Sequence, residues 1–311
     1  MALVIPLVAL ACLDPVVDPT SLVTEPRTLA VAVNPAEVEP GAEVTLTSLY
    51  ADRSGPLATA PIDWSFCTAL KPLAELGPVA RTCLDPSSDA LSPIGEGLEV
   101  TALVPDDACS RFGPNPPPAD AGEPPGRPTD PDPTGGFYQP ALAFDPAITL
   151  VPVRVRCGLA ATTQEVSVAW NLGYHSNQAP TVSALTVDPA PVAAGDHVSV
   201  TVSWPECPAE PLCGDGMCTL GEDLGSCADD CATPVGCGGA EGYLLYDAAS
   251  HALVPRREAL SATWFATAGS FDRPRDGQPD DSDQVDVTNG WQAPDDAGDV
   301  WLGVVLRDDR G

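Results

Sequence analysis

The chain has 311 residues, of which 44 are acidic and 14 basic, so its formal charge is −30. This charge repels phosphate groups and anionic lipid headgroups, which argues against nucleic acid as a partner and leaves an attached lipid as the expected contact with a membrane. The 36 prolines and 27 glycines exclude long uninterrupted helices. The 44% of apolar residues still allows a core, and the length predicts about two domains.

The longest apolar run, residues 1–13, is shorter than the roughly 18–20 residues that cross a bilayer. Its length is typical of the hydrophobic part of a signal peptide, although the usual basic n-region is missing. Residues 9–12 (Ala-Leu-Ala-Cys) resemble a bacterial lipobox, with alanine in place of the usual leucine. The resemblance implies a signal peptide over 1–12, a lipid on Cys12, a tether over 13–26, and a location in the cell envelope, at the outer membrane or cell surface. A buried N-terminal strand is the alternative.

A sequence pattern repeats with an offset of 154 residues. Residues 33–36 (Val-Asn-Pro-Ala) return as 187–190 (Val-Asp-Pro-Ala), and Gly41 returns as Gly195. In each copy the pattern predicts a strand that ends at the proline, a tight turn at the glycine, and a second strand with alternating apolar residues.

Two further strands are expected in each copy. A tryptophan strand surrounds Trp64 in the first copy and Trp264 in the second, and a late apolar strand covers 149–155 and 300–306. The order of these strands resembles bacterial immunoglobulin-like or PKD-like domains. The resemblance implies an all-β fold made of two tandem immunoglobulin-like antiparallel β-sandwiches, over 27–172 and 180–311, joined by a linker over 173–179. A disulfide-rich insert interrupts the second sandwich.

Several details of the domains follow. Residues 164–170 are expected to form the last strand of the first domain, and the second domain has no counterpart of it, so either the reading frame is truncated or another segment fills that edge.

The proline-rich stretch 110–140 is expected to be a solvated loop, with a polyproline ligand as the alternative. Core positions are expected for Trp64, Trp204, Trp264 and Trp301. Trp291 is expected at an exposed loop rim.

The chain has eleven cysteines, and ten remain when Cys12 is assigned to the lipid. An even number in an exported protein predicts disulfides. Cys67 is expected to pair with Cys157, or otherwise with Cys83 or Cys109, because their strands can bring the two Cα atoms within the roughly 4.4–6.8 Å that a bridge requires. Cys83 and Cys109 would then pair with each other.

The most specific motif is residues 213–231, which resemble a module of bacterial extracellular proteins with the pattern C-G-D-G-x-C-x-x-G-E-x-x-x-x-C-x-x-D-C. So short a segment cannot bury a core, so crosslinks must replace one. We expect a neck bridge between Cys207 and Cys237 around an insert over 207–237. The remaining four cysteines would pair within it, namely Cys213, Cys218, Cys227 and Cys231. Zinc is the alternative, and an oxidising compartment favours disulfides.

Acidic side chains of the insert are candidate calcium ligands, because carboxylate oxygens on a crosslinked loop suit that ion. The set is Asp215, Glu222, Asp229 and Asp230. Solvated acids are the alternative, as they are for the acidic stretch 276–286.

The three histidines, His175, His197 and His251, have no second histidine at metal-ligand spacing, and no catalytic motif is found. The sequence therefore predicts a protein that is not an enzyme, with no cofactor unless calcium binds. The expected function is that of a lipid-anchored cell-envelope spacer, adhesive or binding module whose partner is a protein or glycan at the cell surface. The alternatives are a calcium-dependent binding or sensing module and an accessory protein of a carbohydrate-active or proteolytic system.

Overall fold

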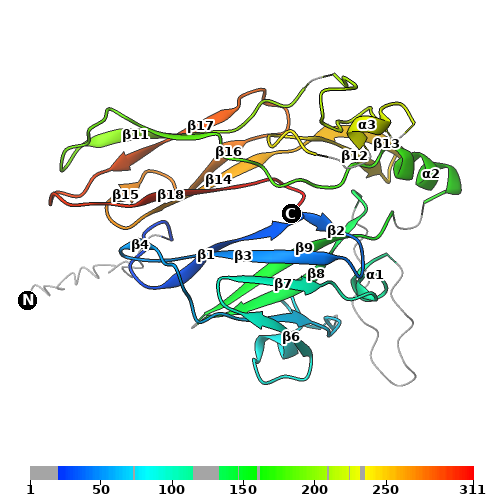
Figure 1. Cartoon of the computed structure of the whole chain (residues 1–311), viewed down its shortest axis with the longest axis horizontal. Coiled ribbons are helices and arrows are strands. Elements are labelled where there is room, and N and C mark those ends of the chain that lie inside the picture. The colour runs from blue at the N-terminus through cyan, green and yellow to red at the C-terminus, as the bar shows by residue number, and fades with distance from the viewer. Residues whose placement is uncertain are drawn as a thin grey trace, which may run out of the picture.

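The computed structural model describes residues 20–72, 74–114, 133–145, 147–159, 162–208, 210–223, 225–231 and 235–311. Its sheets are antiparallel apart from one short parallel strand pair, so the fold is all-β as predicted. Cys12 and the centre of the proline-rich stretch lie outside these residues. The two sandwiches lie side by side, as Figure 1 shows.

The first domain is a sandwich of two sheets. One sheet has the order β1-β3-β4 with β7 paired to β3, and the other has the order β2-β9-β8-β5-β6. The strands are β1 (Arg27–Asn34), β2 (Glu37–Val38), β3 (Glu43–Asp52), β4 (Gly55–Pro56), β5 (Asp63–Cys67), β6 (Leu91–Glu96), β7 (Glu99–Leu103), β8 (Gly136–Phe144) and β9 (Ile148–Arg156). A sheet with β1, β3 and β7 that packs against a sheet with β5, β8 and β9 is the arrangement of immunoglobulin-like sandwiches.

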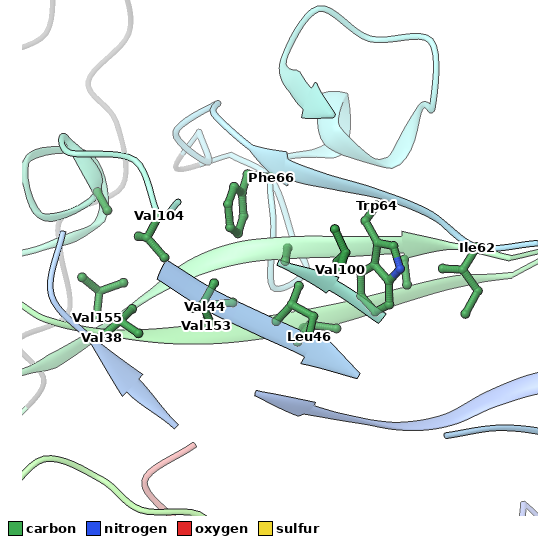
Figure 2. Packing of buried hydrophobic residues seen from close by; sticks show 14 of the residues in the cluster. Val38, Val44, Leu46, Ile62, Trp64, Phe66, Val100, Val104, Val153 and Val155 are labelled. Atoms are coloured by element: carbon green, nitrogen blue, oxygen red, sulfur yellow. The ribbon is translucent and has the colours of Figure 1, made fainter. Parts of the chain in front are cut away.

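The core of the first domain lies between these sheets. In β3, Val44 and Leu46 alternate with outward residues and pack against Trp64 of β5 and Val153 of β9, as Figure 2 shows. The short helices η1 (Arg81–Leu84) and α1 (Ala108–Phe112) lie in the connections. Strand β8 begins at Gly136, so the predicted loop over 110–140 is wrong at both its ends.

The second domain repeats this arrangement in part. One sheet has the order β10-β11-β17-β15, a second has the order β16-β14-β18, and β12 and β13 form a separate hairpin. The strands are β10 (Ala184–Asp188), β11 (His197–Ser203), β12 (Gly242–Asp247), β13 (Ala252–Arg257), β14 (Leu260–Ala266), β15 (Ser270–Phe271), β16 (Arg275–Gln278), β17 (Asp286–Gln292) and β18 (Leu302–Arg307). The core is built around Trp264, with Val198 and Val200 of β11 opposite. The helix α3 (Ala228–Cys231) belongs to the insert.

The stretch predicted as the last strand of the first domain is instead a helix, α2 (Gln164–Gly173). The Thr163 side chain accepts a hydrogen bond from the backbone N–H of Val166 at 3.3 Å, which is an N-cap. Only Trp170 of this helix is buried. Val166 and Val168 alternate as the residues of a strand do, but here they belong to the helix. The last strand of the first domain is therefore β9.

This correction changes how the two copies align. The strand β18 pairs with β14 just as β8 pairs with β5. The equivalent of β18 in the first copy is thus β8, whereas the sequence alignment matched β18 to the segment that forms β9.

The disulfide predicted between Cys67 and Cys157 is wrong. Strand β8 lies between β5 and β9, so these cysteines are two strand spacings apart, roughly 9–10 Å, which is too far for a bridge. Cys67 pairs with Cys83, one of the two alternatives that the sequence left open, across a Cα–Cα distance of 5.6 Å. Cys109 of α1 pairs with Cys157 across 5.4 Å, so the expected pair of Cys83 with Cys109 is wrong too.

The two domains are docked through sheet faces. Trp301, which precedes β18, and Val305 of β18 pack with Phe265 against Leu29 and Val23 of the N-terminal part of the chain. The two sandwiches are thereby joined in one block (Figure 1). In the predicted tether, the described residues 20–26 do not hang free, because Val23 is fully buried and its N–H donates to the Ala266 carbonyl at 2.8 Å.

The tryptophans follow the prediction with two exceptions. Trp64, Trp204 and Trp264 are buried as expected, whereas Trp301, expected in a core, is partly buried and packs at the domain interface. Trp291, expected at an exposed rim, is only 4% exposed and packs into the core of the second domain. The reason is that it lies on β17, on the face that looks toward β14.

Candidate functional site: the cysteine-rich insert and the cavity at its neck

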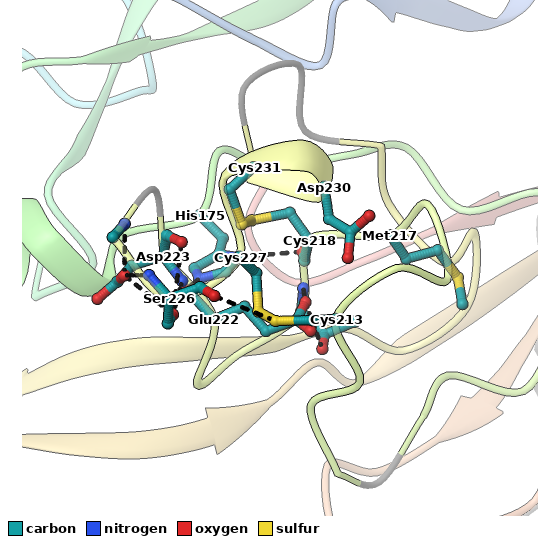
Figure 3. The surroundings of a disulfide bond; sticks show 12 residues. His175, Cys213, Met217, Cys218, Glu222, Asp223, Ser226, Cys227, Asp230 and Cys231 are labelled. Atoms are coloured by element: carbon teal, nitrogen blue, oxygen red, sulfur yellow. Dashed lines mark hydrogen bonds between the residues drawn. A yellow bond between two sulfur atoms is a disulfide. The ribbon is translucent and has the colours of Figure 1, made fainter.

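Three disulfides hold the insert. Cys207 pairs with Cys237 at the neck, the pairing expected there. Inside the insert, Cys213 pairs with Cys227 and Cys218 pairs with Cys231 (Figure 3). All four inner cysteines are therefore disulfide-bonded, and none offers the thiolate that a zinc site requires.

The acidic residues of the insert stabilise its backbone. The Asp230 carboxylate accepts hydrogen bonds from the backbone N–H groups of Gly214 and Gly216. The Glu222 carboxylate accepts from the N–H of Thr219 at 2.8 Å, and Asp215 accepts from the N–H of Met217 at 2.8 Å. So short a segment has little regular structure in which its backbone N–H groups could be paired. These carboxylates therefore accept the hydrogen bonds of those N–H groups instead.

The expected calcium ligands do not converge. Asp215 and Asp229 are exposed, whereas Glu222 and Asp230 are buried. In the described part of the chain, the one group of three metal-ligating residue types within 4.8 Å is Cys213, Glu222 and Cys227. Both of these cysteines are disulfide-bonded, so the arrangement does not suit a hard cation.

His175 joins the insert to the segment between the domains. Its Nδ1 lies 3.1 Å from the Cys218 carbonyl oxygen, and its Nε2 lies 3.0 Å from the Glu222 carbonyl oxygen. Its own carbonyl accepts from the Arg310 guanidinium at 3.2 Å. The sequence placed His175 in a linker with no partner, so this contact was missed.

A cavity of about 360 Å³ lies at the neck of the insert. Its walls come from the insert, the segment between the domains and the β12–β13 hairpin. Polar side chains that line it include His175, Glu206, Thr219, Glu241, Arg256 and Arg257. Arg257 is held by the Asp283 carboxylate at 2.9 Å and Arg256 by Asp280 at 3.7 Å, so the acidic stretch 276–286 supplies partners for these guanidiniums.

Beneath the cavity, buried charges join the two domains. The Arg154 guanidinium donates to the Glu37 carboxylate at 2.8 Å, and both side chains are 1% exposed. Arg154 also donates to the carbonyl of Arg310 in the other domain at 2.9 Å. Glu37 in turn accepts from the N–H of Asn177 at 3.0 Å and from the Tyr174 hydroxyl. Burial raises the pKa of Tyr174, so its hydroxyl remains a donor.

A second buried cation lies beside the first. The Arg310 guanidinium donates to Glu258 at 2.6 Å and to Glu241 at 3.3 Å, and Asp308 lies two residues away in sequence. One guanidinium thus pairs with two carboxyl groups, and the Asp308 carboxylate accepts from the backbone N–H of Arg310 at 2.9 Å. Burial raises the pKa of Glu258 to about 8 and that of Glu241 to about 7, and it also raises the pKa of Asp308. Glu258 and Glu241 hold protons near neutral pH because the single charge of Arg310 does not compensate their desolvation.

Sequence reasoning missed this cluster. Arg154 stands between two valines of β9, a pattern that predicts an outward residue on a solvated face. The residue does point away from its own core, but the second domain covers that face. The sequence does contain one signal for this cluster. The chain has only 14 basic residues, and a basic residue within an apolar strand generally has an acidic partner.

The other histidines lie apart from this cluster. His197 is exposed and its Nε2 lies 3.1 Å from an Asp272 carboxylate oxygen, and His251 lies 3.1 Å from the Tyr246 hydroxyl. Within the described residues, no helix is long and apolar enough to cross a membrane. Five disulfides are typical of proteins that fold in an oxidising compartment, which indicates an exported protein.

Neither the protein-family models nor the curated protein sequences that were searched match this chain. Among solved structures, the chain is similar over 91% of its length to the D0-D1 domain of Intimin, of which 91% is covered, with 9% identity and a TM-score of 0.21. It is similar over 94% of its length to 12% of the α-2-macroglobulin of E. coli, with 10% identity and a TM-score of 0.22. A DUF4785 family protein from Legionella pneumophila is matched over 89% of this chain and 45% of that one, with 8% identity and a TM-score of 0.17.

Proposed function

We propose that this protein is a non-enzymatic, lipid-anchored binding module of the cell envelope that presents its two sandwiches as one rigid block. The observation that carries the proposal is the buried interface between the domains, where Arg154 and Glu37 of one domain meet Arg310 of the other. An interface with buried and hydrogen-bonded charges resists sliding, because any displacement leaves a charge without its partner.

The geometry favours a binding block over an extended spacer. Spacer modules gain length by joining end to end, whereas these sandwiches lie face to face through Phe265, Trp301 and Val305. The docked segment around Val23 reinforces the same contact from the side of the predicted anchor. Such a block presents its loops and edges in fixed positions, which lowers the entropy cost of binding a partner.

Anchoring is proposed to occur through a lipid on Cys12, which the ten paired cysteines leave as the eleventh. The partner is proposed to be a protein or glycan at the cell surface, because a charge of −30 repels nucleic acid and anionic membranes.

Cell fractionation tests the anchor. The wild-type chain is expected in the membrane fraction, and Cys12→Ser is expected in the soluble fraction. A matched control, Val17→Ala, alters the same segment and keeps the cysteine, so it should stay with the membranes. Retention of Cys12→Ser with the membranes would overturn the lipid anchor.

Small-angle X-ray scattering tests the rigid block. The full chain is expected to give a single compact particle whose pair-distance distribution has one maximum. Two maxima, as for sandwiches that move independently, would contradict the block and favour the spacer.

A further inference from the structure

The His175 ring has a hydrogen-bond acceptor at both of its nitrogens. Nδ1 lies 3.1 Å from the carbonyl oxygen of Cys218, and Nε2 lies 3.0 Å from that of Glu222 (Figure 3). A carbonyl oxygen can only accept a hydrogen bond. A neutral imidazole has one N–H and one lone pair, whereas the imidazolium ion has two N–H groups. Only the protonated ring can therefore make both hydrogen bonds.

Burial makes the loss of one of these bonds costly. His175 is 8% exposed, so a ring nitrogen without its proton has little access to water as a replacement partner. Its lone pair would instead face a carbonyl oxygen at a distance of 3.0–3.1 Å. Loss of one proton thus changes one of the two contacts from attractive to repulsive.

The two contacts connect the insert to the block formed by the two sandwiches. His175 belongs to the segment between the domains, and its carbonyl accepts from the Arg310 guanidinium at 3.2 Å, which fixes the position of its backbone. Cys218, Thr219 and Leu220 of the insert form one wall of the neck cavity, and His175 lines the same cavity. The hydrogen bonds of the ring therefore hold this wall in place.

The charges around His175 have opposite effects on its proton. Hydrogen bonds from Ser226 and Gly225 lower the pKa of Asp223, and the charge of His175 lowers it further. This carboxylate favours the imidazolium, whereas the nearby guanidinium of Arg310 disfavours it. The other charged or titratable residues that contact His175 or line the same cavity are Glu206, Glu222, Glu241, Arg256, Arg257 and Asp283.

We propose that His175, Cys218 and Glu222 form a pH-sensitive contact, here called the His175 latch, in which the imidazolium holds the insert and loss of one proton releases it. The Cys207–Cys237 bridge keeps the released insert attached to its neck. The stabilisation is present where the ring is protonated and is lost as the pH rises through the range in which histidine changes charge, roughly pH 5–8. An exported protein meets the pH of its surroundings, so the neck cavity would become more open as these turn alkaline.

NMR of the full wild-type chain tests the latch directly. Nitrogen-15 spectra recorded from pH 5 to 9 show the protonation of each histidine ring, and amide hydrogen exchange over the same range shows the opening of the insert. Exchange rates are divided by the intrinsic rate at each pH to give protection factors. The amides of Thr219 and Glu222 are expected to lose protection about tenfold, as for the loss of one hydrogen bond. The midpoint of this loss should coincide with the midpoint of the His175 ring.

Variants identify the group that responds to pH. His175→Gln keeps an N–H donor that does not titrate, so the protection of the insert should no longer depend on pH. The matched control is His197→Gln, at an exposed histidine whose Nε2 lies 3.1 Å from Asp272, and it should respond like the wild type. Glu241→Gln removes an acid of the same cavity with a pKa of about 7, and it should also keep the response of the insert.

The latch is overturned if the His175 ring is neutral at pH 5, if it keeps both protons up to pH 9, or if it loses one while protection of the insert stays constant. It is also overturned if the pH response persists in His175→Gln or disappears in Glu241→Gln, because another group would then be responsible. The wild-type measurement does not depend on the folding of any variant. None of these outcomes involves Cys12 or the rigidity of the block, so a failure of the latch is distinguishable from a failure of the proposed function.

Discussion

The two sandwiches share a strand order but differ in the neighbours of equivalent strands. In the first domain β8 pairs with both β5 and β9 and Val38 is buried, whereas among the described residues of the second domain β18 pairs with β14 alone and Val192 is partly exposed. The second domain also packs against the first through Phe265, Trp301 and Val305, and it carries the bridges of its insert. The comparison teaches that a repeated sequence pattern determines where strands form, while the neighbours of a strand depend on the rest of the chain.

The largest effect is expected where the two domains meet. Arg154→Met should lower the free energy of unfolding by about 3–5 kcal/mol, because it leaves the Glu37 carboxylate buried without its cation. Chemical denaturation measures this loss. Arg156→Met is the matched control on the same strand, since its ion pair with Glu39 is partly exposed and should contribute less than about 1 kcal/mol. Equal losses for both variants would show that the interface charges do not hold the domains together.

Removal of a disulfide should have different effects on the stability of the first sandwich and of the insert. Replacing Cys67 and Cys83 by serine opens a loop with a sequence separation of 16 within a core, and should cost about 3 kcal/mol of stability for the first domain. Replacing Cys213 and Cys227 opens a loop of similar length, with a separation of 14. Because the insert has no core of its own, this second change should expose residues 207–237 to protease and leave the main melting transition in place. A shift of that transition would indicate that the insert supports the sandwich.

Stability should fall as the pH rises. Glu258 and Glu241 have folded-state pKa values of about 8 and about 7, raised above the ordinary value of 4.5. Between about pH 4.5 and 8 the folded state therefore binds more protons than the unfolded state, so the free energy of unfolding decreases through this window. Melting temperatures measured from pH 5 to 9 check this, and Glu241→Gln should flatten the profile. A profile that rises with pH would contradict the excess of buried acid around Arg310.

The smallest effect compares the two equivalent tryptophans. The indole N–H of Trp64 donates to the Gly97 carbonyl at 2.8 Å, whereas the indole N–H of Trp264 has no hydrogen-bond partner. Both substitutions to phenylalanine remove the same atoms from a core, but only Trp64→Phe also leaves a carbonyl without its donor. Trp64→Phe should therefore be more destabilising than Trp264→Phe, by about 1 kcal/mol. Thermal unfolding of the two variants measures the difference, and equal values would indicate that the hydrogen bond of Trp64 contributes nothing.

The sequence by itself determined the strands and the insert. Alternation of apolar residues, as in Val198, Val200 and Val202, is a local property that any sheet must satisfy, so it predicts a strand without knowledge of its partner. The insert was predictable for a similar reason, because a short segment with four cysteines and few apolar residues has no other means of holding a structure.

Tertiary structure decided the pairings and the interface. Cys67 and Cys157 lie on strands that the sequence made equally plausible neighbours, and only the position of β8 between them excludes the bridge. The cap at Thr163 turned an alternating stretch into a helix. The alternation of β9 places Arg154 on the face away from its own core, and only the second domain buries it there. The disulfide pairing and the burial of Arg154 depend on contacts between residues far apart in the chain, whose free energies are absent from any local pattern, whereas the Thr163 cap is a local contact.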